Sequence, residues 1–305
     1  MRVLITGATG FLGRALVHAL MERGDQRVAL TRDPDRARMA LPGLVYAHAW
    51  DPLAGPPPAG VFDGVDAVVN LMGESVVGRW TQRKKSAILE SRETATRNLV
   101  LGMRDASDAG AAPRTLVNAS AVGYYGHRGE EELTEDAPPG EGFLSDVCVQ
   151  WEAAASQASP SGTRVVLLRT GLVAGRDGGF LAPLSRLTRF GLGGPTGSGR
   201  QWWPWVHLDD VVGLILHALD NEAVQGPLNV CAPDPARQRE VASALGRVLH
   251  RPAFAPAPTF ALRLALGEFA TELLNSRRAL PAAALASGYA FRHTDLDAAL
   301  RDIYE

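Results

Sequence analysis

The sequence is poor in cysteine and in long hydrophobic runs, and each shortage excludes a class of protein. Only two of the 305 residues are cysteines, Cys148 and Cys231, and they lie far apart in the chain. Such sparse cysteine argues against a disulfide scaffold and fits a reducing compartment. No apolar run reaches the length of about 18 residues that a membrane-spanning helix needs, and the first residues do not resemble a signal peptide. We therefore expect a cytoplasmic protein with no membrane partner.

The sequence also has little net charge and few lysines. The formal net charge is −2, and the longest basic run is the triplet at residues 83–85. Nucleic-acid binding requires a positive surface that neutralises phosphates, so we expect no nucleic-acid partner. Of the 31 basic residues, only Lys84 and Lys85 are lysines. This limits any catalysis that depends on a lysine ammonium group.

The first 170 residues alternate apolar runs with segments of helical periodicity. We expect strands at residues 2–6, 27–31, 44–49, 67–71, 116–120 and 164–169, and helices at 14–23, 34–39, 83–106 and 147–158. Strands that alternate with helices indicate a parallel sheet covered on both faces. The sequence therefore predicts an α/β, Rossmann-type, doubly wound fold.

The pattern changes after residue 170. Glycine and proline concentrate between Gly171 and Gly199, where we expect a substrate-side loop region. A helix at 209–219 and a strand at 228–231 follow, and then helices at 237–249, 261–274 and 296–303. We expect residues 1–170 to form a dinucleotide-binding domain to which residues 205–231 return. Residues 171–204 and 232–305 would form a smaller, mostly helical substrate lobe.

A glycine-rich loop, Thr6-Gly7-Ala8-Thr9-Gly10-Phe11-Leu12-Gly13, separates the first strand from the first helix. Its spacing, G-x-x-G-x-x-G, is one residue longer than the usual dinucleotide fingerprint. Glycine permits the tight turn, the close approach of the pyrophosphate and the packing of helix against strand, and the helix N-terminus faces the phosphates. The expected cofactor contacts here are Gly7, Thr9, Gly10, Phe11, Leu12 and Gly13.

The end of the second strand determines the type of cofactor. NAD sites usually place an acidic residue there to hold the ribose hydroxyls, whereas this chain has Thr31-Arg32. An arginine pairs well with a 2′-phosphate. Asp33 follows and could still serve NAD, but we expect it to cap the helix that Pro34 begins. The sequence favours NADP over NAD.

These residues resemble the extended short-chain dehydrogenase/reductase superfamily, in particular an atypical epimerase-like branch that ends in a small helical domain of unknown function. The resemblance runs nearly end to end. It rests on Thr6 to Gly13, Asn70 to Glu74, Ser91-Arg92, Ser120 to Gly126, Trp151-Glu152, Arg169 to Gly171, Gly191 to Gln201, His207 to Asp210, Pro281 and Gly288 to Phe291.

The resemblance implies further cofactor contacts. Asn70, Leu71, Met72 and Gly73 would line the cofactor past the fourth strand, Arg92 would reach it from the long helix, and Leu172 would pass the nicotinamide. Two alternatives stay open. Asn70 could satisfy backbone groups at the strand end, and Arg92 could be a solvated charge.

The chain departs from the superfamily in its catalytic dyad. The superfamily normally uses Tyr-x-x-x-Lys on a helix, where the lysine lowers the pKa of the tyrosine. In this chain Leu144 stands at the tyrosine position and Cys148 at the lysine position. With lysines only at 84 and 85, no tyrosine has a lysine four residues later. The standard dyad is absent.

Ser120 matches the superfamily's catalytic serine, and Tyr124 and Tyr125 follow it at the carboxyl edge of the sheet. We expect Ser120 to bind a substrate oxygen and Tyr124 or Tyr125 to donate the proton, although both tyrosines could simply shape the pocket wall. Cys148 is expected to be a buried packing residue rather than a reactive thiol.

The segment from Gly194 to Trp205 combines glycines with Arg200 and three tryptophans. Arg200 and Trp205 could clamp an anionic or sugar-like substrate, while the tryptophans could instead pack between lobes. His207 follows, either as a general acid or base or as a residue that orders its loop. The seven histidines show no metal-ligand spacing, so we expect no metal site.

Two functions follow from these features. The chain is either an NADP(H)-dependent oxidoreductase or epimerase-like enzyme that acts on a small polar substrate, or an NADP(H)-binding sensor or scaffold without turnover. The sequence does not determine the oligomeric state.

Overall fold

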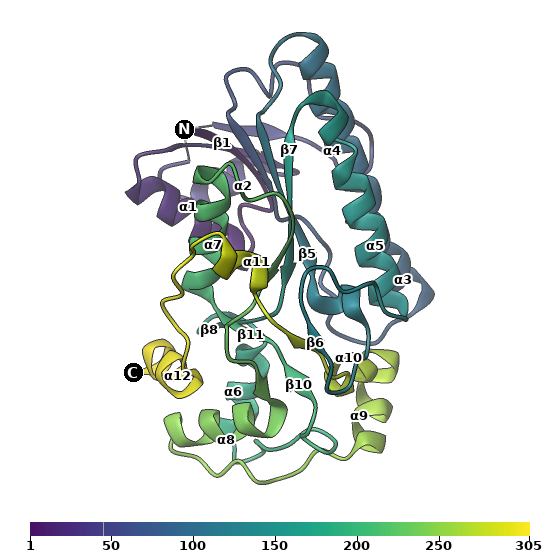
Figure 1. The fold of residues 1–305 in the computed structure, drawn as a ribbon, viewed down its shortest axis with the longest axis vertical. Helices are drawn as coiled ribbons and strands as arrows, with labels where there is room; N and C mark the ends of the chain where they lie inside the picture. The colour runs from purple at the N-terminus through teal and green to yellow at the C-terminus, as the bar shows by residue number, and fades with distance from the viewer. Residues whose placement is uncertain (45) are drawn as a thin grey trace.

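A seven-stranded parallel sheet forms the centre of the computed structural model, which describes residues 1–44 and 46–305. The strand order is β12-β7-β5-β4-β1-β2-β3 (Figure 1). Its members are β1 (Arg2–Thr6), β2 (Gln26–Thr31), β3 (Tyr46–Ala49), β4 (Ala67–Asn70), β5 (Thr115–Ala121), β7 (Arg164–Thr170) and β12 (Gly226–Val230). The expected strand at 44–49 includes Val45, which lies outside the described residues. The α/β Rossmann-type prediction is confirmed.

Helices cover both faces of this sheet. On one face lie α1 (Phe11–Glu22) and α7 (Leu208–Asp220), and on the other α4 (Glu93–Asp108) and α5 (Phe143–Ser156) (Figure 1). Alternate residues of β1 point to opposite faces, so Val3 and Ile5 pack with α1 and α7 while Leu4 packs with α4. Burial on both faces explains why the strands read as continuous apolar runs.

The order in which the chain adds strands to the sheet reverses at β1, whose neighbours are β2 and β4. Strands β2 and β3 extend to one side, and the chain then crosses over to β4, β5, β7 and β12 on the other. In open parallel sheets, ligands bind at the carboxyl ends of the strands at such a switch point. The glycine loop follows β1 at this position.

Several expectations about helices were wrong. The expected helix at 83–106 is two helices, α3 (Gln82–Glu90) and α4, with a break at Ser91 and Arg92. The expected helix at 261–274 is divided by Gly267, whose φ of 61° ends α9 (Thr259–Leu266) before a 3-10 turn, η3 (Gly267–Phe269), and α10 (Ala270–Leu274). The helix expected from Val147 begins at Phe143.

A smaller lobe lies below the sheet (Figure 1). The expected loop region at 171–199 instead contains β8 (Leu172–Gly175), β9 (Gly178–Gly179) and α6 (Leu181–Arg189). Two of its glycines, Gly175 and Gly178, leave room for the ring of Phe11. The lobe also contains β10 (Trp202–Trp203), β11 (Trp205–His207), β13 (Ala236–Arg237), α8 (Gln238–Val248) and α12 (Leu296–Tyr304). Beside the central sheet lie α2 (Pro34–Ala40), η2 (Ser159–Ser161) and α11 (Ala282–Ala286), and the short strand β6 (Glu132–Leu133) pairs with β14 (Arg278–Ala279).

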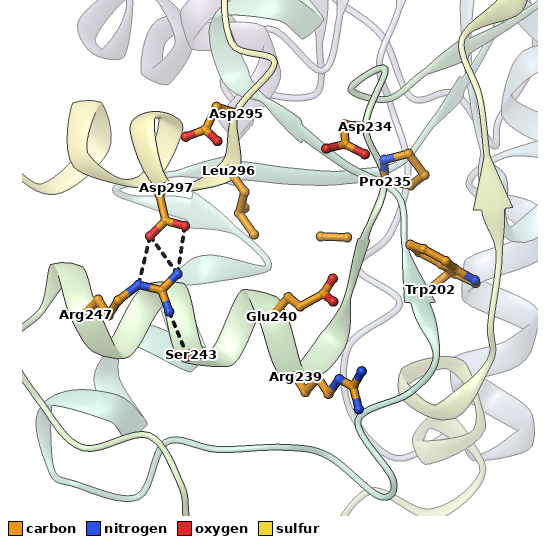
Figure 2. A pocket seen from close by; sticks show the side chains of 11 residues that line it. Trp202, Asp234, Pro235, Arg239, Glu240, Ser243, Arg247, Asp295, Leu296 and Asp297 are labelled. Carbon is orange, nitrogen blue, oxygen red and sulfur yellow. Dashed lines mark hydrogen bonds and ion pairs between the residues drawn. The ribbon is translucent and has the colours of Figure 1, made fainter.

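A pocket of about 600 Å³ opens in this lobe between α8 and the start of α12. Trp202 and Asp234 lie at one end of it, and Arg247 closes the other by donating to Asp297 (Figure 2). Within the described residues, no helix combines the length and the apolar character that crossing a bilayer requires.

Candidate functional site

The glycine loop forms a cradle that side chains would fill. Gly7 has a φ of 68°, and a Cβ there would lie 2.7 Å from the backbone oxygen of Leu71 at the end of β4. A Cβ on Gly13 would collide with the backbone of Gly7 and Ala8. Each glycine therefore allows a backbone contact that no other residue permits.

The first turn of α1 has no side-chain cap. Gly10 occupies the N-cap position and has no side chain, so no capping oxygen accepts from the first backbone amides of the helix. Such a helix end favours a phosphate by its free N–H groups and its dipole. The cradle thus fits the pyrophosphate of a dinucleotide.

Three residues at the end of β2, Thr31, Arg32 and Asp33, have distinct environments. Asp33 caps α2, since its Oδ1 accepts from the backbone N of Arg36 at 3.0 Å. This confirms the capping role expected of Asp33. Arg32 is exposed beside it, and Thr31 Oγ1 accepts from the amide of Asp33 at 3.3 Å. The carboxylate is engaged by the helix, and the guanidinium is accessible.

Asn70 is a positioning residue rather than a lining residue. Its side chain is fully buried, its Oδ1 accepts from Thr6 Oγ1 at 2.5 Å, and its Nδ2 donates to Thr96 Oγ1 (2.9 Å) and Asn118 Oδ1 (2.6 Å). It therefore links β1, β4, β5 and α4. The expectation that its side chain contacts the cofactor has no support here, whereas Leu71, Met72 and Gly73 beyond it remain accessible.

Arg92 occupies the break between α3 and α4 and points back toward the end of β4. Its Nη1 donates to the backbone oxygens of Glu74 (2.9 Å) and Ile88 (3.1 Å), and its guanidinium lies 5.1 Å from the ring of Trp151. A Cβ on Gly73 would lie 3.0 Å from its Cζ. Arg92 is therefore not the solvated helix charge of the alternative interpretation.

Phe11 and Leu172 connect the cradle to the smaller lobe. The ring of Phe11 lies against Gly175 and Gly178, which flank the turn between β8 and β9. Leu172 begins β8, directly after β7 and Gly171, and its N donates to the oxygen of Pro204 at 2.7 Å. Both residues border the carboxyl edge of the sheet.

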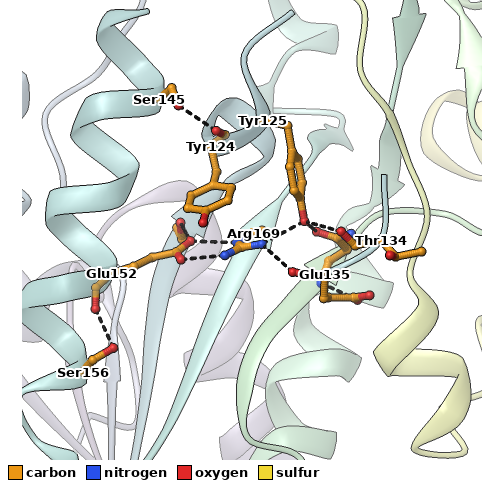
Figure 3. A network of polar contacts seen from close by, with 10 residues as sticks. Tyr124, Tyr125, Thr134, Glu135, Ser145, Glu152, Ser156 and Arg169 are labelled. Atoms are coloured by element: carbon orange, nitrogen blue, oxygen red, sulfur yellow. Dashed lines mark hydrogen bonds and ion pairs between the residues drawn. The ribbon is translucent and has the colours of Figure 1, made fainter. Parts of the chain in front are cut away.

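A buried ion pair organises the polar groups at the ends of β5 and β7 (Figure 3). Arg169 donates to both oxygens of Glu152, through Nε to Oε1 (2.9 Å) and Nη2 to Oε2 (2.9 Å), and both side chains are almost fully buried. Ser120 Oγ donates to the same Oε1 at 2.6 Å. The expected catalytic serine is thus already bound to a carboxylate.

The two tyrosines differ in environment. Tyr125 is fully buried, its hydroxyl donates to Asn229 Oδ1 at 2.7 Å, and burial raises its pKa to about 12. Tyr124 is half-buried, and its ring lies 3.6 Å from the guanidinium of Arg169. Figure 3 shows the Tyr124 ring above the Arg169–Glu152 pair while Tyr125 points toward Thr134. Tyr125 has a structural position, and Tyr124 is the tyrosine that a ligand can reach.

The two vacated dyad positions lie beside Gly123, the residue that precedes Tyr124. Leu144 Cβ and Cys148 Sγ are 3.5 Å and 3.7 Å from where a Cβ on Gly123 would stand, in the 3-10 turn η1 (Val122–Tyr125). Burial raises the pKa of Cys148 to about 11, although the charge of Arg92 opposes this rise. The thiol is a packing residue, as expected, and Arg92 is the cation near the former lysine position.

The tryptophans divide between the core and the pocket. Trp205 has no exposed surface, packs with Trp203 and donates from Nε1 to the oxygen of Asp234 at 3.0 Å. The expectation that Trp205 contacts the substrate was wrong, because the strand β11 turns its ring inward. Trp202 is instead partly exposed in the pocket of Figure 2, with Arg237 4.2 Å from its ring, and Arg200 is exposed nearby.

His207 begins α7 and orders its loop. Its Nδ1 accepts from the backbone N of Asp209 at 3.1 Å, and its ring stacks on His293 at 3.7 Å. Asp209, His293 and Asp302 surround it, a set of groups that could in principle surround a metal. Because Nδ1 is an acceptor, the neutral ring carries its proton on Nε2, which faces Asp302 and offers no lone pair to a metal. The absence of a metal site stays a prediction.

The pH dependence of stability tests this environment. Burial, and then the neighbouring His293, lowers the pKa of His207 from 6.5, although Asp209, Asp302 and Asp210 oppose the shift. The unfolded chain therefore takes up this proton at a higher pH than the folded protein, and the free energy of unfolding falls as the pH drops below about 6.5. We expect His207→Asn, which replaces the capping Nδ1 by a capping side-chain oxygen, to flatten that fall in thermal unfolding between about pH 5 and 7. Equal slopes for both proteins would contradict the assignment.

Sequence reasoning missed Glu152, Arg169 and Trp202 as members of the site. An arginine at the end of an otherwise apolar strand is the signal that could have identified Arg169, because such a charge requires a buried partner. No spacing in the sequence indicates that Glu152 is that partner, or that Trp202 rather than Trp205 lines the pocket.

The strand order, the glycine cradle at the switch point and the serine and tyrosines at the carboxyl edge define an extended short-chain dehydrogenase/reductase.

Comparison with known proteins identifies the family more closely. Residues 3–231 match the NAD dependent epimerase/dehydratase family, and residues 257–303 match a domain of unknown function, DUF1731. The chain belongs to this epimerase family.

Three similar proteins are informative. The chloroplastic homologue of epimerase family protein SDR39U1 from Arabidopsis thaliana is 39% identical, over 100% of this chain and 87% of the relative. Epimerase family protein YfhF from Bacillus subtilis is 36% identical, over 99% and 98%. The crystal structure of human SDR39U1 (isoform2) with NADPH is 37% identical, covers 100% of this chain and 99% of that chain, and has a TM-score of 0.88.

Proposed function

We propose that this protein is an NADP(H)-dependent oxidoreductase or epimerase-like enzyme that acts on a small polar substrate. The observation that carries the proposal is the placement of Tyr124, which lies on the Arg169 guanidinium directly after Gly123, the residue beside the two vacated dyad positions. The cradle fits a dinucleotide, and the human relative was crystallised with NADPH. When bound, the nicotinamide would supply hydride transfer.

Arg32 supports NADP over NAD. Its exposed guanidinium stands at the end of β2, where a 2′-phosphate would lie, and Asp33 is engaged as a helix cap. We expect Arg32→Ser to weaken NADPH binding by about 10- to 100-fold, as loss of a charged hydrogen bond implies, and to leave NADH binding unchanged.

Fluorescence titration with both coenzymes measures this effect. Arg104→Ser, which removes an exposed arginine on α4, is the matched control and should bind as the wild type does. Equal losses for NADPH and NADH, or stronger NADH binding by the wild type, would contradict the role of Arg32.

Four side chains would together replace the missing dyad. Tyr124 would exchange the proton with the substrate oxygen, and Arg169 would hold a positive charge under its ring. Arg92, whose positive charge acts to lower the pKa of the Cys148 thiol, would take the role of the lysine near the nicotinamide ribose. Ser120, whose proton is donated to Glu152, would accept a hydrogen bond from a hydroxyl group of the substrate.

The substrate would be anionic or sugar-like. Arg200 is exposed on the segment that leads to the pocket, and Trp202 is partly exposed there, with the guanidinium groups of Arg237 and Arg278 at 4.2 Å and 4.9 Å from its ring. An arginine pairs with a phosphate or carboxylate, and an indole stacks on a sugar or a flat ring. NADPH oxidation over a panel of carbonyl compounds, with and without a phosphate or carboxylate, tests this class.

A sensor or scaffold without turnover is the second candidate, and the absent Tyr-x-x-x-Lys dyad favours it. The same experiment separates the two functions. Tight NADPH binding with no NADPH oxidation across the panel, and no interconversion of nucleotide sugars, would support the sensor and overturn the enzyme. We place either function in the cytoplasm, because both thiols are buried and unpaired.

A further inference from the structure

The lower end of the smaller lobe carries a surface that the proposed function does not use. Residues 186–192, from α6 into the next loop, and residues 251–264, from the end of α8 into α9, build this surface. The second segment crosses the lower end of the molecule in Figure 1. Backbone contacts hold the two segments side by side: Ala255 N donates to Gly193 O (3.2 Å), and Ala257 N donates to Pro195 O (2.8 Å).

Large apolar side chains protrude from both segments. The exposed fractions are 78% for Phe190, 64% for Leu192, 80% for Phe254, 75% for Phe260 and 76% for Leu264. Phe260 and Leu264 lie one turn apart on α9 and share a face, and α9 contributes no fully buried residue to the core. A helix of a globular protein normally buries its apolar face, so this one requires a partner.

The two segments themselves carry charges of one sign, and the acidic residues that follow α9, Glu268 and Glu272, are paired with Lys85 and Arg277. Residues 178–199 contain Arg186 and Arg189 but no aspartate or glutamate. Residues 241–267 contain Arg247, Arg251 and Arg263 and again no acidic residue, although Arg247 pairs with Asp297 of α12. Arg263 is exposed on α9 between Phe260 and Leu264.

The positive charge of this surface indicates which kind of partner binds there. A symmetric dimer through this surface would set arginines against arginines, because an isologous interface brings the same patch to both sides. Anionic lipid matches both features: arginines stay at the phosphates while phenylalanine and leucine enter the acyl region. We propose that this surface seats the protein on an anionic phospholipid membrane.

The proposal reverses the expectation of no membrane partner. That expectation rested on the absence of a membrane-spanning run, and the described helices contain no span. A peripheral surface assembled from two segments, which join only in the folded lobe, leaves no such run in the sequence.

Co-sedimentation of the full chain with vesicles tests the proposal. The protein should pellet with vesicles of phosphatidylcholine mixed with phosphatidylglycerol, not with phosphatidylcholine alone, and added salt should release part of it. Arg263→Glu should weaken binding by about fivefold or more, and Phe260→Ser with Leu264→Ser by about tenfold or more.

Two exposed residues elsewhere serve as matched controls. Met39→Ser removes an apolar side chain that is 80% exposed on α2, and Arg104→Glu reverses an exposed charge on α4; both should bind as the wild type does. Thermal unfolding checks that every variant folds. Failure to pellet with anionic vesicles, or equal losses in the control variants, would overturn the proposal, as would a dimer that Phe260→Ser converts to a monomer. None of these readouts depends on turnover.

Discussion

Tyr124→Phe is expected to lower kcat by about 100- to 10,000-fold, the range for loss of a general acid or base, and to leave NADPH binding unchanged. The phenylalanine ring retains the contact with Arg169, which lies 3.6 Å from the ring, so only the exchangeable proton is lost. Turnover of the carbonyl substrate found in the panel, together with NADPH titration of the same variant, measures both quantities.

Tyr125→Phe is the matched control because the two tyrosines are consecutive and only Tyr125 is fully buried. Burial raises its pKa to about 12, which keeps the proton on the hydroxyl. That hydroxyl donates to Asn229 and accepts from Arg169 Nη1 at 3.1 Å, so the variant removes one Arg169 contact but leaves the Tyr124 hydroxyl in place. We expect this variant to lose about 1–3 kcal/mol of stability and to retain turnover at temperatures where it is folded. Normal kcat in Tyr124→Phe would contradict the role of Tyr124 as the proton donor.

Arg169→Met is expected to lower the free energy of unfolding by about 3–5 kcal/mol, because it leaves the Glu152 carboxylate buried without its cation. Ser120 would still donate to Glu152, but one neutral hydroxyl does not replace a bidentate guanidinium. Glu152→Gln alone should also destabilise, since it removes the charge that Arg169 faces.

The double variant Glu152→Gln with Arg169→Met should lose less than the sum of the single losses, since neither charge is then left unpaired. Urea unfolding of the four proteins gives the coupling energy. Additive losses would show that the pair does not act as a unit. If the double variant folds, its turnover then reports whether the charge under Tyr124 is needed in addition to the hydroxyl.

Local sequence rules determined the dinucleotide half of this protein. Periodicity distinguished strands from helices. The glycine loop could be predicted because the need for glycine there is local: neighbouring backbone lies where a Cβ on Gly7 or Gly13 would collide with it. The cap formed by Asp33 was equally predictable, since a capping side chain reaches only three residues along the chain.

Helix breaks were less predictable because they depend on contacts outside the helix. The sequence from 83 to 106 has helical periodicity throughout, yet Ser91 turns away to accept from the amide of Glu74 at 2.9 Å, and Arg92 follows it toward β4. Only the folded chain brings Glu74 to that position.

The catalytic side of the site was decided by tertiary structure. The sequence shows that no tyrosine is paired with a lysine, but it does not show that Tyr125 is buried while Tyr124 rests on Arg169, or that Glu152 from α5 neutralises an arginine of β7. Burial and charge pairing join residues that are distant in the chain, whereas turn and capping rules act within a few residues. For that reason the sequence alone determined the cradle, and only the folded protein determined its chemistry.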